Sequence, residues 1–548
     1  MMENPRAVRY VTAFAAAMLF AAVSLSAQTA RPGNAAAPAA GPTECAALSG
    51  LALGNGATVT SAAMVTSGTL QISPNTTITN MPGFCRVQGI SKPSSASNIF
   101  FEVWLPDRAN WNGKFLSTGE GGFAGTPNYG RDGRDGAMDE IVRRGYATAS
   151  TDTGHKNTDG NWAIGHPEVA ADYLYRAKHA TTVAAKAVIA AFYGRSPSHS
   201  YFSSCSNGGR QGLIEAQRYP EDFDGLIIGA PWNFQSHSNA GFVWDMQAMS
   251  APGAAVPAEK LPALNAAVLA QCDKADGLAD GILSNPPACH FDPTSLICQG
   301  PDGPNCLTRA QAEAVQKVYD GPVNPRTGES VFPGFAPGSE ASWAGIIRVP
   351  TGGATGLISY FSNLAFEDPA WNPLTFNFDR DMAAVDDKTG RLGNAVALSY
   401  AGANARGVKI IQYHGWNDQT LQPAYSPQYY EEVAAANGGL AATENWYRLF
   451  MVPGMTHCSN GPGASNFGGV GQQIPPVRDA EHDLVVALER WVEQGVPPAQ
   501  FIGTKFTDGD AATRSIAFTR PLCLYPAVPH YSGSGNPNDA ASFTCVTP

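Results

Sequence analysis

The stretch Tyr-Phe-Ser-Ser-Cys-Ser-Asn-Gly-Gly-Arg-Gln-Gly, residues 201–212, decides how the rest of the chain is interpreted. An aromatic, β-prone run stops here at small residues and gives way to the helical pattern Leu213–Arg218. A strand that turns sharply into a helix holds the central side chain of the turn, Ser206, in the open beside free backbone N–H groups. We therefore expect Ser206 to be a nucleophile, although Ser-rich and Gly-rich turns also match this pattern without being catalytic.

Length and composition bound the class of protein. At 548 residues the chain is long for one domain, which predicts a main domain with a large insertion or two domains. Hydrophobic residues make up 44% of the sequence, enough for a sizeable core. The formal net charge is −11 and no basic run is present, which argues against a nucleic-acid partner and favours a small-molecule one.

The N-terminal segment has the order of a secretory signal peptide. Arg6 and Arg9 precede the apolar run Val11–Val23, and small residues follow. We expect residues 1–27 to be removed on export and residues 28–42, rich in Ala, Pro and Gly, to form a disordered leader. A retained anchor is the alternative, but the apolar run is short for a bilayer and no later stretch is long enough. The mature protein is therefore expected to be secreted or periplasmic, without a membrane partner.

Strand and helix patterns alternate on both sides of the serine turn. Three strand-like runs and then a helical pattern precede the serine turn, and a compact apolar strand follows it. The three runs are Phe100–Leu105, Lys114–Leu116 and Ala147–Thr151, the helical pattern is Glu168–Phe192, and the apolar strand is Asp222–Pro231. Strand, helix and strand in this order indicate a parallel sheet with right-handed crossovers.

The alternation stops at about Trp232. Residues 232–395 are rich in Pro and Gly and contain four cysteines and an aromatic cluster. Two strand-like runs, Val408–His414 and Trp446–Val452, then resume the core. We therefore predict an α/β core split into residues 43–231 and 396–548, with a lid domain inserted after the strand that follows the nucleophile helix.

The loops after these two late strands supply partners for Ser206. Asp418 follows the first strand and His457 follows the second. The order Ser206, Asp418, His457 is that of the α/β-hydrolase triad, in which the histidine takes the serine proton and the carboxylate orients the imidazole. His414, at the end of its strand, is expected to line the pocket.

The segment Gly119–Gly125 lies after an early strand-like run and contains too many glycines for a regular element. Glycine lets backbone approach a ligand closely, and here an oxyanion hole would draw its first N–H donor. A flexible surface loop is the alternative.

Ten cysteines, an even number behind an export signal, predict disulfides, because compartments outside the cytoplasm are oxidising. Zinc ligation is the alternative, but the sequence has no Cys-x-x-Cys pair. Cys205 adjoins Ser206, and Cys458 adjoins His457. A bond between them would staple the nucleophile turn to the histidine loop, whereas two unrelated buried thiols are the alternative.

Asp273, Asp276 and Asp280 fall in one short Gly-containing loop. Three carboxylates this close repel one another unless a hard cation lies between them, and the carbonyls of Leu278 and Ile282 would complete an oxygen shell for Ca²⁺. The spacing is not that of an EF-hand. A solvated acidic turn is the alternative.

Together these features resemble the tannase and feruloyl esterase family of α/β-hydrolases, whose hallmark is a Cys-Ser and a His-Cys pair joined by a disulfide around an intervening Asp. The resemblance covers nearly all of the mature chain. It rests on Gly119–Gly125, Ala177–His179, Cys205–Gly212, Gln217–Pro231, Cys272–Ile282, Tyr413–Asp418 and His457-Cys458.

The resemblance implies a role for individual residues. It assigns catalysis to Ser206, Asp418 and His457, and the oxyanion donors to the backbone N–H groups of Asn207 and Gly121, with Gly122 as the alternative glycine. It implies a structural Ca²⁺ held by Asp273, Asp276, Leu278, Asp280 and Ile282. It also implies five disulfides, which are Cys45 to Cys85, Cys205 to Cys458, Cys272 to Cys289, Cys298 to Cys306 and Cys523 to Cys545.

Two positions depart from the family pattern. Ser204 stands where the nucleophile turn usually has Gly, which puts a side chain in a crowded bend. Hydrolases of monohydroxyethyl terephthalate, in the same family, bind a free carboxylate with a lid Arg, but residues 350–363 contain no Arg, and we place Leu357 at that position. An apolar residue cannot pair a buried carboxylate, so a neutral or phenolic aromatic acyl group suits this pocket better.

We therefore hypothesise a secreted, calcium-containing serine esterase that cleaves esters of aromatic acids, feruloyl or galloyl in type, through an acyl-enzyme. Trp343 and Phe361 are candidates to hold the aromatic ring, although lid core is the interpretation that we favour for such side chains. Hydrolysis of terephthalate monoesters is the first alternative, and a non-catalytic module that binds phenolics is the second. The sequence leaves the oligomeric state open.

Overall fold

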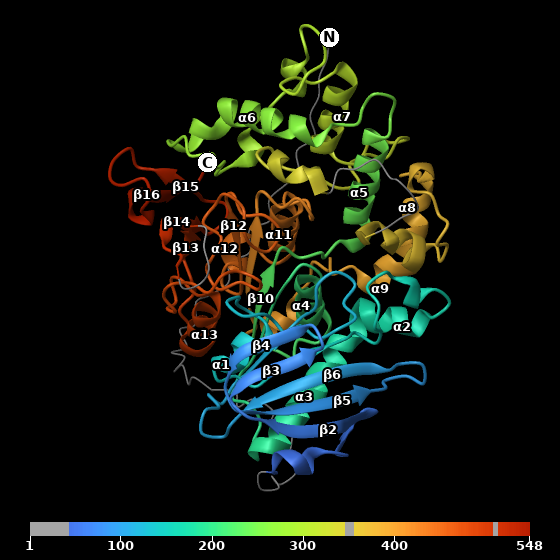
Figure 1. Ribbon diagram of the computed structural model, residues 1–548, viewed down its shortest axis with the longest axis vertical. Coiled ribbons are helices and arrows are strands. Elements are labelled where there is room, and N and C mark those ends of the chain that lie inside the picture. Colours follow the sequence, from blue (N-terminus) through green and yellow to red (C-terminus); the bar gives the residue numbers. More distant parts are fainter. Residues whose placement is uncertain (1–42, 346–355, 508–512) are drawn as a thin grey trace, which may run out of the picture. The chain divides into compact units, whose positions relative to one another are not determined.

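The computed structural model of the chain describes residues 43–345, 356–507 and 513–548 (Figure 1). Two five-stranded sheets form its centre. Neighbouring strands of the first sheet are all antiparallel, in the order β1 (Ala52–Gly54), β2 (Ala57–Val65), β5 (Phe84–Ser91), β6 (Ile99–Pro106) and β8 (Thr148–Thr151). The predicted signal peptide and leader, residues 1–42, lie outside the described residues.

The second sheet is entirely parallel. Its order is β12 (Tyr447–Val452), β11 (Lys409–Gly415), β10 (Gly225–Gly229), β9 (Ser200–Cys205) and β7 (Phe115–Thr118). An isolated parallel bridge between Phe115 and Ala147 joins β7 to the residue before β8, so the two sheets are continuous. The residues of β7, β9 and β10 are all buried, as expected for parallel strands covered on both faces.

Successive residues of the central strands point to opposite faces of the sheet. Phe202 and Ile228 belong to one hydrophobic core, whereas Tyr201 and Ile227 belong to another. The first core is completed by α3 (Ala177–Tyr193), α4 (Asn207–Arg218) and α11 (Tyr425–Ala436), and the second by α1 (Met138–Arg143) and α13 (Leu484–Gln494). Helices therefore cover both faces of the parallel sheet, and only the ends of its strands are left uncovered by them.

The helix predicted over Glu168–Phe192 is interrupted in the structure. A short helix, α2 (Pro167–Ala171), passes through a π-helical turn at Asp172–Arg176 before α3 begins. The cause is tertiary: the fully buried guanidinium of Arg210 donates to two carbonyls of this turn at 2.6 and 3.3 Å. The wider turn satisfies a buried charge that local helical spacing does not reveal.

Among its described residues, the segment between β10 and β11 contains helices and isolated β-bridges but no β-strand. It contains α5 (Gln235–Met249), α6 (Leu261–Cys272), α7 (Arg309–Asp320), α8 (Arg380–Val385), α9 (Arg391–Gly393) and, after residue 395, α10 (Ala401–Ala405). Its side chains form a core that also includes Tyr173 and Leu421 from the flanking parts of the chain. The boundaries of a lid domain at residues 232 and 395 therefore remain a prediction.

The remaining elements are short. They are the hairpin of β3 (Gly68–Ser73) and β4 (Thr76–Met81), the pair β13 (Gln500–Phe506) and β14 (Ile516–Cys523), the pair β15 (Val528–Tyr531) and β16 (Phe543–Val546), and helix α12 (Leu440–Thr443). No helix in the described ranges is long and apolar enough to cross a membrane.

Candidate active site

Ser206 occupies the sharp turn between β9 and α4. Its φ and ψ angles are 66° and −127°, in a region that residues with side chains rarely adopt. Hydrogen bonds hold the turn on both sides: the Ser206 N–H donates to the carbonyl of Gly229 at 3.0 Å, and its own carbonyl accepts from the N–H groups of Arg210 and Trp232. The strained turn therefore presents the serine hydroxyl at the C-terminal edge of the parallel sheet.

Ser204, the departure from the usual glycine, fits because its neighbours lack side chains. A Cβ atom added at Gly208 would lie 1.9 Å from the Ser204 hydroxyl oxygen, and one added at Gly119 would lie 3.0 Å from it. Both separations are well below ordinary contact distances. The crowding expected at position 204 is thus accommodated by glycine on the facing loop and on the first turn of α4.

The structure brings the three expected residues into one hydrogen-bonded row. His457 Nε2 lies 2.9 Å from the hydroxyl oxygen of Ser206, and His457 Nδ1 lies 2.7 Å from Asp418 Oδ2. The residues come from three loops that follow β9, β11 and β12, which are separated by long stretches of sequence. This is the geometry in which an imidazole can take a proton from a hydroxyl while a carboxylate orients it.

Asp418 is fully buried and its two oxygens are saturated with donors. Oδ1 accepts from the backbone N–H groups of Thr420 and Leu421, and Oδ2 faces both His457 and His414. Burial acts to raise the pKa of Asp418, but the charge of His457 and the hydrogen bonds of both histidines outweigh it and hold the pKa below its usual range. The carboxylate is therefore ionised at neutral pH.

His414 does not line the pocket, contrary to the prediction. Its side chain is 1% exposed, with Nε2 at 3.1 Å from Asp418 and Nδ1 at 2.7 Å from the hydroxyl of Ser426. Both ring nitrogens are engaged, one by the carboxylate of Asp418 and the other by the hydroxyl of Ser426. The residue supports the row instead of contacting a substrate.

The glycine-rich loop is tied to the nucleophile helix. The side chain of Asn207 donates to the carbonyl of Glu120 at 3.0 Å, and the N–H of Glu120 donates to Gln211 at 3.0 Å. Gly121 lies on the same cleft as Ser206. Among the described residues, no group accepts the backbone N–H of Gly121 or of Asn207. Both donors are thus available beside the serine hydroxyl, as an oxyanion site requires.

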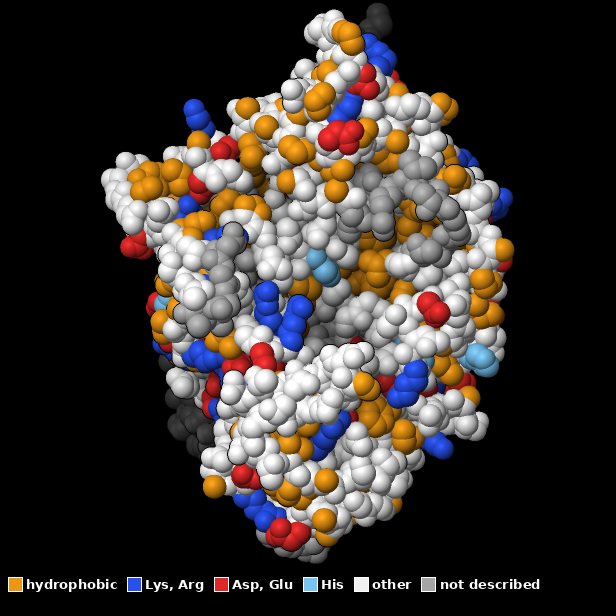
Figure 2. Space-filling model, viewed as in Figure 1, with side chains coloured by type: hydrophobic (Ala, Val, Ile, Leu, Met, Phe, Trp, Pro, Cys, Tyr) orange, Lys and Arg blue, Asp and Glu red, His pale blue; other side chains and the backbone are white. Residues whose placement is uncertain are grey.

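A cleft of about 740 Å³ opens beside Ser206 and His457. Its walls come from the glycine-rich loop, the turn of the β3–β4 hairpin and the loop that follows His457. Figure 2 shows the molecule hollowed above the hairpin, with a histidine and basic side chains near the margin of the hollow. The reactive hydroxyl is therefore accessible from solvent.

Trp343 and Phe361 do not lie on this cleft, which agrees with the favoured interpretation of both side chains as core and not with contact to a substrate ring. Trp343 is 1% exposed, donates to the hydroxyl of Ser339 and packs against Tyr319. Phe361 is 0% exposed and stacks on Phe376 at 4.9 Å between ring centroids. Both side chains are core of the helical segment between β10 and β11.

The structure contains five disulfides, with the pairing that the family resemblance implies. They are Cys45 to Cys85, Cys205 to Cys458, Cys272 to Cys289, Cys298 to Cys306 and Cys523 to Cys545. The second joins the residue before Ser206 to the residue after His457 across 253 positions of sequence. It links the nucleophile turn directly to the histidine loop.

Oxygen donors gather in the predicted calcium loop. The carboxylate of Asp273 accepts from backbone N–H groups at 3.0–3.1 Å, and Asp276 accepts from the hydroxyl of Ser284 at 2.6 Å. Burial raises the pKa of both carboxyls, and the charge of Asp280 adds to the effect. Within the described chain, the carbonyls of Leu278 and Ile282 accept no hydrogen bond. Oxygen ligands of this kind are those that Ca²⁺ prefers, but the carboxylate oxygens of Asp273, Asp276 and Asp280 do not all lie within 4.8 Å of one another.

Asp280 differs from the other two carboxylates of this loop. One of its oxygens lies 2.6 Å from the guanidinium of Arg520, so a cationic side chain already neutralises part of its charge. Within the ranges that the structure describes, Asp273 and Asp276 form no ion pair with a cationic side chain.

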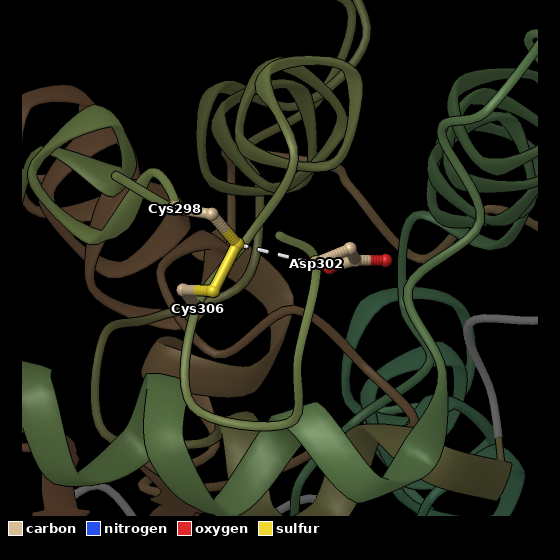
Figure 3. A group of neighbouring side chains, drawn as sticks. All are labelled: Cys298, Asp302 and Cys306. Carbon is tan, nitrogen blue, oxygen red and sulfur yellow. Dashed lines mark hydrogen bonds between the residues drawn. A yellow bond between two sulfur atoms is a disulfide. The ribbon is translucent and has the colours of Figure 1, made fainter. Parts of the chain in front are cut away.

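In the described chain, two groups of three possible metal ligands have ligand atoms within 4.8 Å of one another. Figure 3 shows Cys298, Asp302 and Cys306, but the two sulfurs form a disulfide and offer no thiolate. In the other group His179 lies 2.6 Å from Asp222, near the buried Glu215. Lys178 and Lys186 supply positive charge near Glu215.

Comparison with known proteins gives this arrangement a family. The model of the family described as tannase and feruloyl esterase matches residues 85–546. The chain belongs to this family. The matched range includes the nucleophile turn, the loops of Asp418 and His457, and four of the five disulfides in full.

Individual relatives agree over most of their length. An uncharacterized esterase of Xanthomonas campestris pv. campestris is 39% identical over 501 residues, 86% of this chain and 86% of that protein. A probable feruloyl esterase B-2 of Aspergillus flavus is 33% identical over 461 residues, 82% of this chain and 85% of that protein. The crystal structure of feruloyl esterase B from Aspergillus oryzae superposes with a TM-score of 0.82 at 29% identity, covering 90% and 97% of the two chains.

This member of the tannase and feruloyl esterase family is thus a carboxylic ester hydrolase that acts on esters of aromatic acids, and its fold is α/β-hydrolase-like.

The sequence interpretation missed the residues that support the site. Ser426 and Gln211 are polar positions within helices and carry no local signal. His414 carried one, because it lies four residues before Asp418 at the end of a strand, but its burial was not foreseen.

Proposed function

We propose that the chain is an exported serine esterase that hydrolyses esters of feruloyl-type or galloyl-type acids through an acyl-enzyme. The observation that carries this proposal is the row from Asp418 through His457 to Ser206, with contacts of 2.7 and 2.9 Å. The family and its feruloyl esterase relatives support the aromatic acyl group.

The residues divide the reaction into two steps. Ser206 attacks the ester carbonyl while its proton passes to His457 Nε2, and the N–H groups of Asn207 and Gly121 hold the oxyanion. His457 then returns this proton to the alcohol oxygen, the C–O bond breaks and the alcohol leaves. In the second step, water gives a proton to His457 and attacks the acyl-enzyme, and the proton finally returns to Ser206 as the aromatic acid departs.

Asp418 serves both steps without changing its own protonation. Its ionised carboxylate accepts from Nδ1 of His457, which leaves Nε2 free to face Ser206. When the imidazole takes up the serine proton, the buried negative charge stabilises the resulting cation.

Replacing Ser206 with alanine tests the mechanism. We expect Ser206→Ala to lower kcat on methyl ferulate by on the order of a million-fold, because loss of a triad nucleophile leaves only binding and oxyanion stabilisation. Ser204→Ala removes the adjacent hydroxyl and serves as the matched control, with activity expected to remain within about tenfold. Turnover that survives in Ser206→Ala, or a parent protein without esterase activity, would contradict the proposal; the latter would favour a non-catalytic binding module.

A substrate panel tests the acyl group. Purified protein is given methyl ferulate, methyl gallate and monohydroxyethyl terephthalate, and kcat/KM is compared. We expect one of the first two to be preferred, because a free carboxylate on the acyl ring needs a cationic partner. Preference for the terephthalate monoester would assign the chain to the alternative substrate class.

Calcium and export complete the proposal. Ca²⁺ would be held by carboxylates of Asp273 and Asp276 and carbonyls of Leu278 and Ile282, with Asp280 at the edge of the loop, and bound there it would supply structural stability.

Five disulfides are typical of proteins outside the cytoplasm. They support a secreted or periplasmic location.

A further inference from the structure

Three arginines gather at the rim of the active-site cleft. Arg131 is exposed and lines the cleft that contains Ser206 and His457. Arg134 donates to the carbonyl of Gly471, another wall of the cleft, at 3.2 Å. Arg514 donates at 3.3 Å to the carbonyl of residue 474, three positions further along the same strip of backbone. The guanidinium groups thus converge from two distant parts of the sequence on one side of the cleft.

Among the described residues, no neighbouring acid neutralises the charge of this group. Asp132 pairs with Arg143 at 3.1 Å, and Asp135 pairs with Arg478 at 3.0 Å, so both acids adjacent in sequence are already occupied. In the part of the chain that the structure describes, no carboxylate forms an ion pair with Arg131, Arg134 or Arg514. Burial, and then the positive charges of the other two arginines, lower the pKa of Arg134.

The arginine group is unusual for this protein, whose net charge is −11. The field of the whole chain therefore opposes the approach of an anionic substrate, whereas a cationic rim at the cleft attracts one locally. Basic side chains are visible near the margin of the hollow in Figure 2. Repulsion among like charges is tolerated most readily where an anion binds between them.

The walls of the cleft indicate which part of the substrate lies here. They include the hydroxyl or amide side chains of Ser73, Thr76, Asn128 and Ser459. Ile72, Pro127 and Val470 also line the cleft, so an aromatic ring finds apolar surface beside these polar groups. The leaving alcohol must receive its proton from His457, which lies on the same cleft. A polar, hydroxylated alcohol matches both features.

We propose that Arg131, backed by Arg134 and Arg514, forms an anion subsite for the alcohol part of the substrate. The preferred substrates are then aromatic esters whose alcohol carries a free carboxylate, such as hydroxy acids and acidic sugars. Guanidinium is suited to this role because it binds a carboxylate through two parallel hydrogen bonds. The inference rests on the proposed function and extends it from the acyl group to the leaving group.

A matched pair of substrates tests the subsite. The caffeoyl ester of quinic acid carries a carboxylate on its alcohol, and its methyl ester presents the same scissile bond without the charge. Release of caffeate is followed for both. We expect the wild-type kcat/KM to favour the anion by about tenfold, the effect of one charge-assisted hydrogen bond, and the ratio to approach one in Arg131→Gln. Arg131→Lys should keep part of the preference.

Arg195→Gln is the matched control, because Arg195 is an exposed arginine that rests on Trp111 away from the cleft. It removes the same net charge and should leave the substrate ratio as in the wild type. High salt, about 1 M, should reduce the ratio in the wild type and in Arg195→Gln, but not in Arg131→Gln. A wild type without preference for the anion, or an equal loss of activity on both substrates in Arg131→Gln, would overturn the proposal.

Failure of the proposed function is distinguishable from failure of the subsite. If the wild type hydrolyses neither these esters nor methyl ferulate, the esterase assignment has failed. The subsite is then tested by binding: Ser206→Ala protein should bind caffeoylquinate about tenfold more tightly than its methyl ester in calorimetry, and Ser206→Ala with Arg131→Gln should not. Equal affinities for the two compounds in the first protein would contradict it.

Discussion

Nε2 of His414 lies 3.1 Å from Oδ2 of Asp418, the same oxygen that His457 contacts at 2.7 Å. Behind His414, Nδ1 lies 2.7 Å from the hydroxyl of Ser426, which itself accepts from the amide of Gln412 at 2.9 Å. With its oxygen engaged by Gln412, the Ser426 hydroxyl donates its proton to Nδ1, so that the neutral ring carries its proton on Nε2 and donates to Asp418. The network therefore aims a second donor at the triad carboxylate.

We predict that His414→Phe lowers kcat about tenfold and changes KM little, because it removes a hydrogen bond to an ionised, buried carboxylate that acts only through His457. His414→Gln can still donate to Asp418 and should recover most of the rate. His166→Phe, at an exposed position, is the control. Steady-state kinetics on methyl ferulate give the values. A kcat in His414→Phe equal to that of the control would mean that His457 alone orients the carboxylate.

Much of the fold could be predicted because its local patterns agree with its tertiary structure. The apolar run Asp222–Pro231 contains β10, and the runs ending at His414 and Val452 coincide with β11 and β12 to within a residue. In each case a buried parallel strand is apolar on both faces, so no tertiary information is needed to recognise it. The triad could be placed for the same reason, since its residues follow strand ends.

What could not be predicted depends on contacts between distant residues. The break in the helix before α3 is caused by Arg210, and the inward orientation of His414 by Ser426. The arginine rim is invisible in the sequence, since Arg131 and Arg514 are separated by nearly the whole fold.

The disulfide from Cys205 to Cys458 should matter for catalysis as well as stability. Replacing both cysteines with serine frees the nucleophile turn from the histidine loop, and the approach of Ser206 to His457 tolerates little displacement. We expect kcat/KM on methyl ferulate to fall at least about tenfold at a temperature where the variant is still folded by circular dichroism. The control replaces Cys298 and Cys306, which close a loop far shorter, and should retain activity within about twofold. Equal effects of the two replacements would refute a catalytic role for the staple.

Calcium should stabilise the folded protein. An ion that binds only the native loop raises the melting temperature by mass action, so we expect the chelated wild-type protein to melt at a lower temperature and to recover on addition of Ca²⁺. Asp276→Asn should melt at the lower temperature whether or not Ca²⁺ is present. Asp302→Asn, which removes an exposed carboxylate elsewhere in the helical segment, should respond to Ca²⁺ like the wild type. Differential scanning calorimetry measures all three proteins. If the melting temperature of the wild-type protein does not change when Ca²⁺ is added or removed, the loop is an ordinary acidic turn.

His155 should make stability depend on pH. Burial lowers the pKa of His155 to about 4 in the folded protein, where its Nε2 contacts the carbonyl of Phe123 and its ring stacks on Trp162. In the unfolded chain the pKa is about 6.5. Between these values the unfolded state binds a proton that the folded state does not, so the free energy of unfolding falls as the pH drops below about 6.5 and is unaffected above it.

The loss attributable to His155 is about 2 kcal/mol by pH 5, and His155→Gln should abolish it. Glutamine can still donate to the carbonyl of Phe123 but does not titrate. Urea unfolding at pH 7 and pH 5 gives the loss for each protein, and other groups that titrate in this range contribute equally to both. His166→Gln is the control, since an exposed histidine has no burial to relieve and should leave the wild-type loss intact. The same loss in His155→Gln as in the wild type would show that the buried ring is not the group responsible.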